Sequence, residues 1–108
     1  MARIAKRLHG PALVTNAAAT KYTVPALTKT IIRHIHIQNP SPSAVTFTMS
    51  IGADAAAVRL FDAYVIAATS VLDHFCYYVV EAAEIVQALA GTTNILVLTI
   101  DGDESVLS

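Results

Sequence analysis

Four side chains in this sequence have the types and spacing that a metal site requires. His34 and His36 are separated by one residue, and His74 and Cys76 repeat that spacing. Because residues i and i+2 of a strand share a face, each pair could direct two ligands at one ion, and the four together would complete a tetrahedral zinc site. Nothing in the sequence makes the two segments neighbours, and the CxxC spacing of structural zinc sites is missing. The sequence therefore favours solvated or interfacial histidines and predicts neither a metal ion nor another cofactor.

The other polar residues form no catalytic motif. The segment 101–104 (DGDE) begins like a calcium loop but lacks the later ligands of the twelve-residue pattern. Asp73 and His74 are adjacent, so on a strand they would point to opposite faces and could not act as an orienting acid and a base. The sequence has no G-x-S-x-G elbow and no glycine-rich phosphate loop ahead of a helix. We therefore expect no catalytic residues and no enzymatic activity.

The composition is that of one folded domain with few surface charges. Hydrophobic residues make up 55% of the 108 residues and charged residues 14%, against about 25% charged in a typical soluble protein. This excludes disorder, and the apolar run at 63–72 is too short and interrupted to cross a membrane. Cys76 is the only cysteine, which excludes an intrachain disulfide and predicts a buried, inert thiol. We expect a single domain over 1–108 whose surface is largely covered by other protein, with no membrane partner.

Charge is divided unevenly between the two halves of the sequence. Residues 1–54 contain six basic residues and one acidic residue, whereas 55–108 contain one basic residue and seven acidic residues. We interpret 1–10 as an extended basic arm and 102–108 as a short acidic tail, each meeting an oppositely charged surface on a neighbouring chain, with chance segregation as the alternative. The cations of the arm are therefore candidate partner contacts: Arg3, Lys6 and Arg7. Nucleic acid is not an expected partner, because no further basic or aromatic cluster accompanies them and the net charge is −1.

A two-residue period runs through most of the sequence and predicts β-strands. In 45–51 the alternation is unbroken, which places four apolar residues on one face, toward the core: Val45, Phe47, Met49 and Ile51. In 30–38 the same pattern places Ile31, Ile35 and Ile37 on one face and His34, His36 and Gln38 on the other, with Ile32 interrupting the polar face.

Six further candidate strands bring the total to about eight. They span 12–15, 21–24, 64–67, 71–80, 85–89 and 95–100. Turn-forming residues separate the strands at 39–43, 52–54, 91–94 and 101–103, and the short alanine clusters are interpreted as loops or single turns. Short strands at this regular spacing predict an all-β fold, an antiparallel β-sandwich of jelly-roll type.

Aromatic residues crowd one stretch of the second half. Phe75, Tyr77 and Tyr78 lie within one predicted strand, and Tyr64 precedes it. Tyr77 and Tyr78 must point to opposite faces of that strand, only one of which can be the main core. The aromatic side chains are therefore either core and strand surface or an interface, and both tyrosines are candidate partner contacts.

Four segments also form a recognisable pattern together. They are 20–26 (TKYTVPA), an isoleucine-rich strand at 35–39 that ends in Asn39, the threonine-alternating segment 43–56 (SAVTFTMSIGADAA) and 59–63 (RLFDA). With a later acidic turn and a last strand, they resemble small virion structural proteins of tailed bacteriophages over about residues 8–102. The pattern would often have glycine where Ala83 stands, and glycine or a polar residue where Leu27 stands.

The resemblance implies a β-sandwich present in many copies on a virion. We expect a capsid decoration (cement) protein bound to the major capsid lattice, with a minor tail or baseplate protein as the alternative. A carbohydrate-binding module at the host surface is less favoured, because it would need an aromatic platform and the sequence has no tryptophan. The expected partners are other copies of the chain, with a trimer as one candidate order, and the major capsid protein or tail proteins. The expected location is the capsid surface or the tail, after synthesis in the host cytoplasm without a secretion signal.

Overall fold

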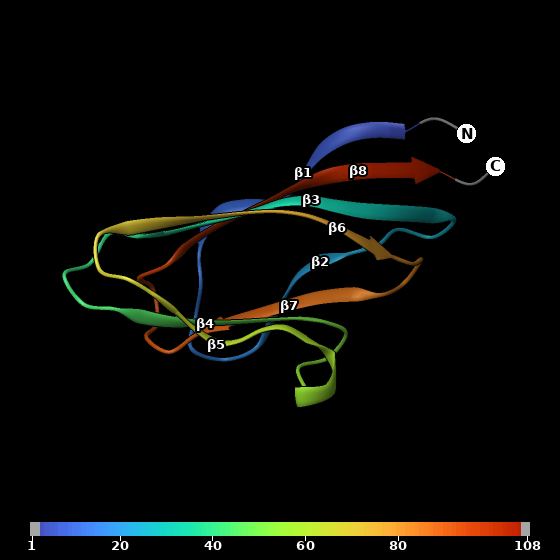
Figure 1. Cartoon of the computed structure of the whole chain (residues 1–108). Coiled ribbons are helices and arrows are strands. Elements are labelled where there is room, and N and C mark those ends of the chain that lie inside the picture. The colour runs from blue at the N-terminus through green and yellow to red at the C-terminus, as the bar shows by residue number, and fades with distance from the viewer. Residues whose placement is uncertain (1–2, 107–108) are drawn as a thin grey trace.

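The computed structural model describes residues 3–106 and contains two four-stranded antiparallel sheets packed face to face (Figure 1). The strands are β1 (Arg3–Leu13), β2 (Ala19–Thr23), β3 (Thr28–Asn39), β4 (Val45–Ile51), β5 (Arg59–Ile66), β6 (Ser70–Val80), β7 (Ile85–Ala90) and β8 (Val97–Val106). A single turn of 3-10 helix, η1 (Ala56–Val58), precedes β5. The predicted antiparallel β-sandwich of about eight strands is confirmed.

The strand order is that of a jelly roll. One sheet, here named sheet A, has the order β1-β8-β3-β6, and the other, sheet B, has the order β2-β7-β4-β5. Strands that follow one another along the chain alternate between the sheets, except that β4 and β5 lie in the same sheet. Eight strands arranged in this way form the double Greek key that viral capsid domains, lectins and cupins share. Among residues 3–106, no helix is long and apolar enough to cross a membrane.

The two ends of the described chain are neighbouring strands (Figure 1). The antiparallel register of β1 and β8 places cations beside carboxylates, and three ion pairs join them: Arg3–Asp103 at 3.8 Å, Lys6–Glu104 at 3.2 Å and Arg7–Asp101 at 4.0 Å. The basic and acidic segments therefore pair with each other inside one chain, as strands of one sheet. Residues 1–2 of the predicted arm and 107–108 of the predicted tail lie outside the described residues.

The core lies between the sheets, and β4 contributes its centre. Phe47 and Met49 are fully buried, Val45 is almost fully buried, and Ile51 is partly buried against the same cluster. The predicted facing of this strand is confirmed. Its opposite face is also covered, because Thr48 is buried and its hydroxyl accepts a hydrogen bond from the backbone N–H of Ala63 in β5.

A bulge in β3 corrects the predicted facing of the residues before it. The register of β3 shifts between Ile32 and His34 against both neighbouring strands. Against β8 the extra residue is Arg33 of β3, whereas against β6 the extra residue lies on β6. Ile32 and Ile35 are therefore both in the core, whereas Ile31 lies outside the core cluster. Strict alternation puts Ile31 with Ile35, and one inserted residue reverses that parity for everything before it.

Two of the five described non-glycine residues with left-handed backbone lie in the β2–β3 and β6–β7 turns. Leu27 in the β2–β3 turn has φ 56°, and Ala83 in the β6–β7 turn has φ 68°. These are the two positions at which the phage-protein pattern would have glycine, or at Leu27 a polar residue. A Cβ atom is disfavoured in this conformation, whereas glycine adopts it freely.

Replacing Ala83 by glycine is expected to raise the free energy of unfolding by about 0.5–1 kcal/mol, because the strain at positive φ exceeds the added entropy of the unfolded chain. Equilibrium denaturation in urea measures the change. Ala82→Gly is the matched control in the same turn, and since Ala82 is not among the positive-φ residues, its replacement is expected to be neutral or destabilising. Equal effects of the two changes would contradict the account.

A polar contact joins the two sheets near the chain ends. The Tyr22 hydroxyl of β2 donates to the carboxylate of Glu104 in β8 and lies 2.8 Å from the Thr30 hydroxyl of β3. Burial, and then the bond to Glu104, raise the pKa of the Tyr22 phenol to about 12. Lys6 reaches the other carboxylate oxygen of Glu104. The acidic end of β8 is thus a structural part of the sandwich.

Candidate functional site

The outer face of sheet A presents a row of exposed apolar side chains on its last strand. Along β6, the even-numbered residues Leu72, Cys76 and Tyr78 pack against the core, so the odd-numbered side chains point outward. Four of these are apolar or aromatic and are here named the β6 stripe: Val71, Phe75, Tyr77 and Val79. Phe75 is 77% exposed and Tyr77 is 61% exposed. A row of exposed apolar side chains of this kind is typical of a surface that another molecule covers.

Asp73 interrupts the stripe and joins two histidines of β3. The register places His36 opposite Asp73 and His34 opposite Phe75. Oδ1 of Asp73 lies 2.9 Å from Nε2 of His34 and 2.6 Å from Nδ1 of His36, both hydrogen-bond distances. The hydrogen bond from His36, and then that from His34, hold the pKa of the Asp73 carboxyl below its ordinary value. His34, His36 and Asp73 are here named the histidine cluster.

The His34 ring is held from two further sides. The Phe75 ring stacks on it with 4.4 Å between centroids and an interplanar angle of 5°. Oδ2 of Asp101, in β8, lies 3.7 Å from Nδ1 of His34, the ring nitrogen that faces away from Asp73. His34 lies on the outer face with His36, as alternation with Ile35 predicts, and the strands on either side of β3 supply its neighbours.

The histidine cluster has the parts for binding a cation but not those for nucleophilic catalysis. Its three candidate ligand atoms all lie within 4.8 Å of one another. A carboxylate-oriented imidazole could act as a base only toward a nucleophile within hydrogen-bond reach. In the part of the chain that the structure describes, the rings of His34 and His36 hydrogen-bond to Asp73 alone.

The other pair of candidate ligands lies on the opposite face of β6. His74 contacts the Tyr78 hydroxyl at 3.1 Å, and Cys76 packs against the core with its sulfur 3.5 Å from the Ile32 carbonyl oxygen. Burial raises the pKa of the Cys76 thiol, which is partly rather than fully buried. The four-ligand site considered from the sequence is therefore not assembled, because its two halves face away from each other.

The predicted partner contacts fall into two groups. Tyr77 is exposed in the β6 stripe, where the Arg33 guanidinium lies 5.3 Å from its ring centroid. Tyr78 is partly buried against the core, so the two tyrosines do point to opposite faces. The β1 cations are ion-paired within the chain, yet half or more of each side chain remains exposed: Arg3, Lys6 and Arg7.

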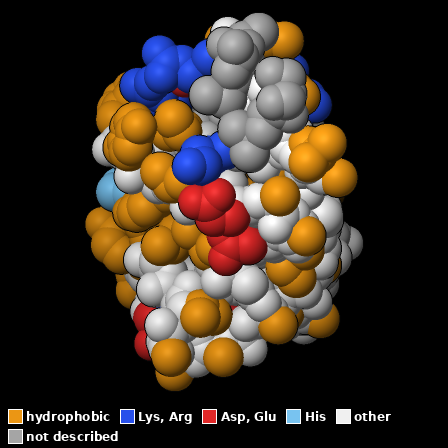
Figure 2. Space-filling view, turned by 90° about the vertical axis from the view of Figure 1, so that its right-hand side faces the viewer, with side chains coloured by type: hydrophobic (Ala, Val, Ile, Leu, Met, Phe, Trp, Pro, Cys, Tyr) orange, Lys and Arg blue, Asp and Glu red, His pale blue; other side chains and the backbone are white. Residues whose placement is uncertain are grey.

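Figure 2 faces the end of the sandwich that carries both termini. Lysine and arginine side chains gather near the termini, and a small group of acidic side chains lies below them. Apolar side chains line both flanks of this view. In this view the charged side chains lie near the termini and the apolar side chains lie along the flanks.

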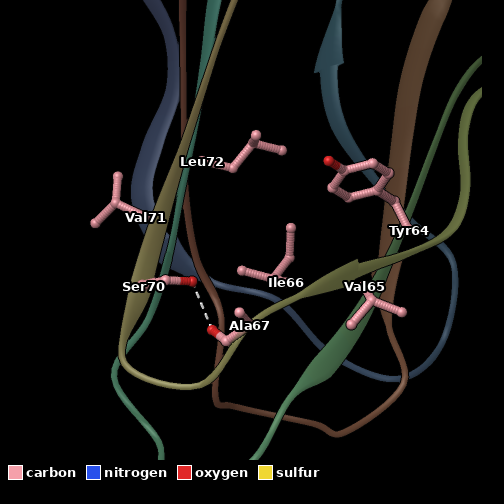
Figure 3. Close-up of a pocket in the computed structure, with 7 residues that line it drawn as sticks. All are labelled: Tyr64, Val65, Ile66, Ala67, Ser70, Val71 and Leu72. Atoms are coloured by element: carbon pink, nitrogen blue, oxygen red, sulfur yellow. Dashed lines mark hydrogen bonds between the residues drawn. The ribbon is translucent and has the colours of Figure 1, made fainter.

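A hollow of about 190 Å³ lies where β5 turns into β6 (Figure 3). Tyr64, Ile66 and Leu72 point into the space between the two sheets, whereas Val71 points away from it. The Ser70 hydroxyl closes the turn by donating to the Ala67 carbonyl oxygen at 2.6 Å. The lining contains one phenol and one hydroxyl but no carboxylate, imidazole or thiol, so it offers no acid–base pair.

Sequence reasoning missed two members of this site. The sequence pairs Asp73 only with its neighbour His74, and it places Asp101 only in an incomplete calcium loop and a turn. Alternation along 71–80 does place Asp73 on the face of Phe75 and Tyr77, but the partner strand is not encoded in that pattern. No family model matches the chain, and searches of curated proteins and of solved structures find no match.

Proposed function

We propose that this protein is a non-enzymatic structural component of a bacteriophage virion, a decoration protein that binds the capsid lattice in many copies. The observation that carries the proposal is the β6 stripe, an exposed apolar row on a strand at the edge of its sheet. The phage-protein pattern of segments 20–26, 35–39, 43–56 and 59–63 supports the choice of a virion. The jelly roll is compatible with it, although fold alone does not assign a function.

The edge itself supports a protein partner. Soluble proteins protect edge strands with lysine, proline or short length, because unpaired backbone groups invite pairing with other chains. β6 is 11 residues long and contains no lysine, arginine or proline. Its outward side chains are apolar except for Asp73. A surface of this kind would promote aggregation of a free monomer. It is suited to a protein whose edge strand stays buried in an assembly.

The partner is expected to bury Phe75 and Tyr77 at the centre of the contact. Aromatic side chains contribute large apolar area at small entropic cost, and they dominate protein interfaces. Arg33, which lies against the Tyr77 ring, adds a cation at the rim. The paired cations of β1 contribute less, because β8 already neutralises them and exposed charges are screened by salt.

The test is binding of the purified chain to particles assembled without it, measured by co-sedimentation and by immunogold labelling of heads and tails. Wild-type protein is expected to label heads. Phe75→Ser is expected to weaken binding by about 30-fold, the effect of losing one interface hot spot of about 2 kcal/mol. Leu27→Ser is the matched control, since Leu27 is 68% exposed but lies outside the stripe, and it should bind like wild type.

The outcomes separate the alternatives. Labelling of tails would overturn the decoration role in favour of a minor tail or baseplate protein. Unchanged binding by Phe75→Ser, with circular dichroism showing an intact fold, would show that the stripe is not the contact surface. Absence of binding to either part of the particle would overturn the virion proposal.

A further inference from the structure

We infer that His34, His36 and Asp73 form a binding site for a divalent transition-metal ion, with zinc as the best-fitting ion. This inference goes beyond the proposed function and does not depend on it. It rests on three side chains from two neighbouring strands that direct two nitrogens and one oxygen toward a common point. Two imidazoles and one carboxylate are a ligand set that zinc accepts, with a fourth position left for water. The expectation of no metal, drawn from the sequence, considered a different ligand set.

The distances between the candidate ligand atoms are close to those found around a bound zinc ion. Asp73 Oδ1 lies 2.9 Å from His34 Nε2 and 2.6 Å from His36 Nδ1, with hydrogen atoms between them. Around zinc, with bonds of about 2.0–2.2 Å, tetrahedral ligand atoms are about 3.4 Å apart. Each histidine nitrogen must therefore move away from the carboxylate oxygen by roughly 0.5–0.8 Å, and the two nitrogens lie within 4.8 Å of each other, so side-chain rotation can supply the adjustment. Replacing two hydrogen bonds by coordination thus needs no change in the strands.

Each histidine can carry its N–H hydrogen on the ring nitrogen that does not bind the metal. A neutral imidazole carries one N–H, and the nitrogen that ligates a metal must be the bare one. When His34 ligates through Nε2, its hydrogen moves to Nδ1, where Asp101 Oδ2 lies at 3.7 Å and can draw in to accept it. A carboxylate behind a metal-bound histidine is the recurrent arrangement that fixes the tautomer and strengthens the ligand. His36 ligates through Nδ1, which leaves its hydrogen on Nε2.

The ligand side chains are held in place by their neighbours and are also accessible from solvent. Phe75 fixes the plane of the His34 ring by stacking on it, and the ligands stand on strands rather than on loops. The side chains of His34, His36 and Asp73 are 24%, 35% and 46% exposed, so an ion can reach them from solvent. The open coordination position faces outward, on the same side as the β6 stripe.

The experiment uses the untagged full-length protein, dialysed against a chelator and titrated with zinc alone in a calorimeter. One ion per chain is expected. His36→Ala and Asp73→Asn should each weaken zinc binding at least tenfold, and Asp101→Asn about tenfold, the effect typical of losing the group behind a ligand histidine. Cys76→Ser and Asp62→Asn are controls for thiolate binding and for lost negative charge, and both should bind like wild type.

Cobalt absorption supplies a readout that a purely structural ion pair would not change. Tetrahedral cobalt bound by nitrogen and oxygen should show visible bands without the near-ultraviolet charge-transfer band of a thiolate. Thermal melts of each variant without metal establish that these exposed substitutions leave the fold intact. No binding by wild-type protein would overturn the inference, as would binding that survives in His36→Ala and Asp73→Asn, or binding that disappears in Cys76→Ser.

Discussion

Replacing Phe47 by alanine is expected to lower the free energy of unfolding by about 3–5 kcal/mol. Phe47 is fully buried in β4, with its ring 5.6 Å from that of Phe61. Pairing with β5 and β7 on either side holds the backbone of β4 in place, so the space left by the ring cannot close completely. The loss therefore combines the transfer energy of the missing ring with the cost of a cavity.

The matched control is Phe75→Ala, which makes the same chemical change on the outer face of sheet A. Phe75 is 77% exposed, so its removal costs only the stacking on His34, below about 1 kcal/mol. Guanidinium denaturation followed by circular dichroism measures both variants. Comparable losses for the two would mean that β4 does not present Phe47 to the core.

The facing of β4, which buries Phe47, shows how much of the fold was predictable from the sequence. An unbroken seven-residue alternation admits only one register with an apolar face, so the facing of β4 follows from residue types alone. Eight short strands separated by turn residues then leave a sandwich as the natural arrangement. Leu27 and Ala83 could also be singled out beforehand, because they depart from the phage-protein pattern, and the structure shows both at positive φ, where glycine is favoured.

The sequence did not predict the bulge in β3 or the close approach of two strands at Gly102, because both depend on how neighbouring strands pair. The bulge at Arg33 leaves no mark beyond an apolar residue, Ile32, on a face predicted to be polar. Gly102 was interpreted as a turn residue but lies within β8, where a Cβ atom would come within 2.1 Å of the Ile31 carbonyl oxygen. Close backbone approach and turn formation both select glycine, and only the pairing of strands separates them.

The candidate site failed to emerge for the same reason. His34 and His36 were identified from their spacing, but Asp73 is 37 residues beyond His36 in the chain and meets it only through the register of β3 with β6. The pairing of β1 with β8 is more distant still, with Lys6 and Glu104 separated by 98 positions. Local periodicity indicates which face a side chain occupies, whereas long-range pairing decides which neighbours it has.

Asn39 is the buried polar residue from which the second large effect is expected. It ends β3 with no exposed surface, and its amide nitrogen donates to the carbonyl oxygens of Ser43, Ile66 and Ala67 at 2.9, 3.0 and 3.2 Å. Its side-chain oxygen accepts from the backbone N–H and the hydroxyl of Ser41. One side chain thus fastens the proline-containing loop 40–44 to the turn between β5 and β6.

Asn39→Asp is expected to lower the free energy of unfolding by about 2–3 kcal/mol at neutral pH, because it turns a carboxylate oxygen toward carbonyl oxygens that had a donor. Burial and those carbonyls should raise the pKa of the new acid above its unfolded value. Stability should therefore recover as the pH falls, since the protonated acid can donate as the amide did, and be lost again as the pH rises through the folded pKa.

Gln38→Glu is the matched control, the same amide-to-acid change on the adjacent, exposed residue of β3. It should alter stability by less than about 0.5 kcal/mol and show no such recovery at low pH. Urea denaturation of both variants across the acidic range measures the difference. Identical pH profiles would mean that the Asn39 amide does not hold the two loops together, and the loop 40–44 would then depend on its own Ser41 and Ser43 contacts.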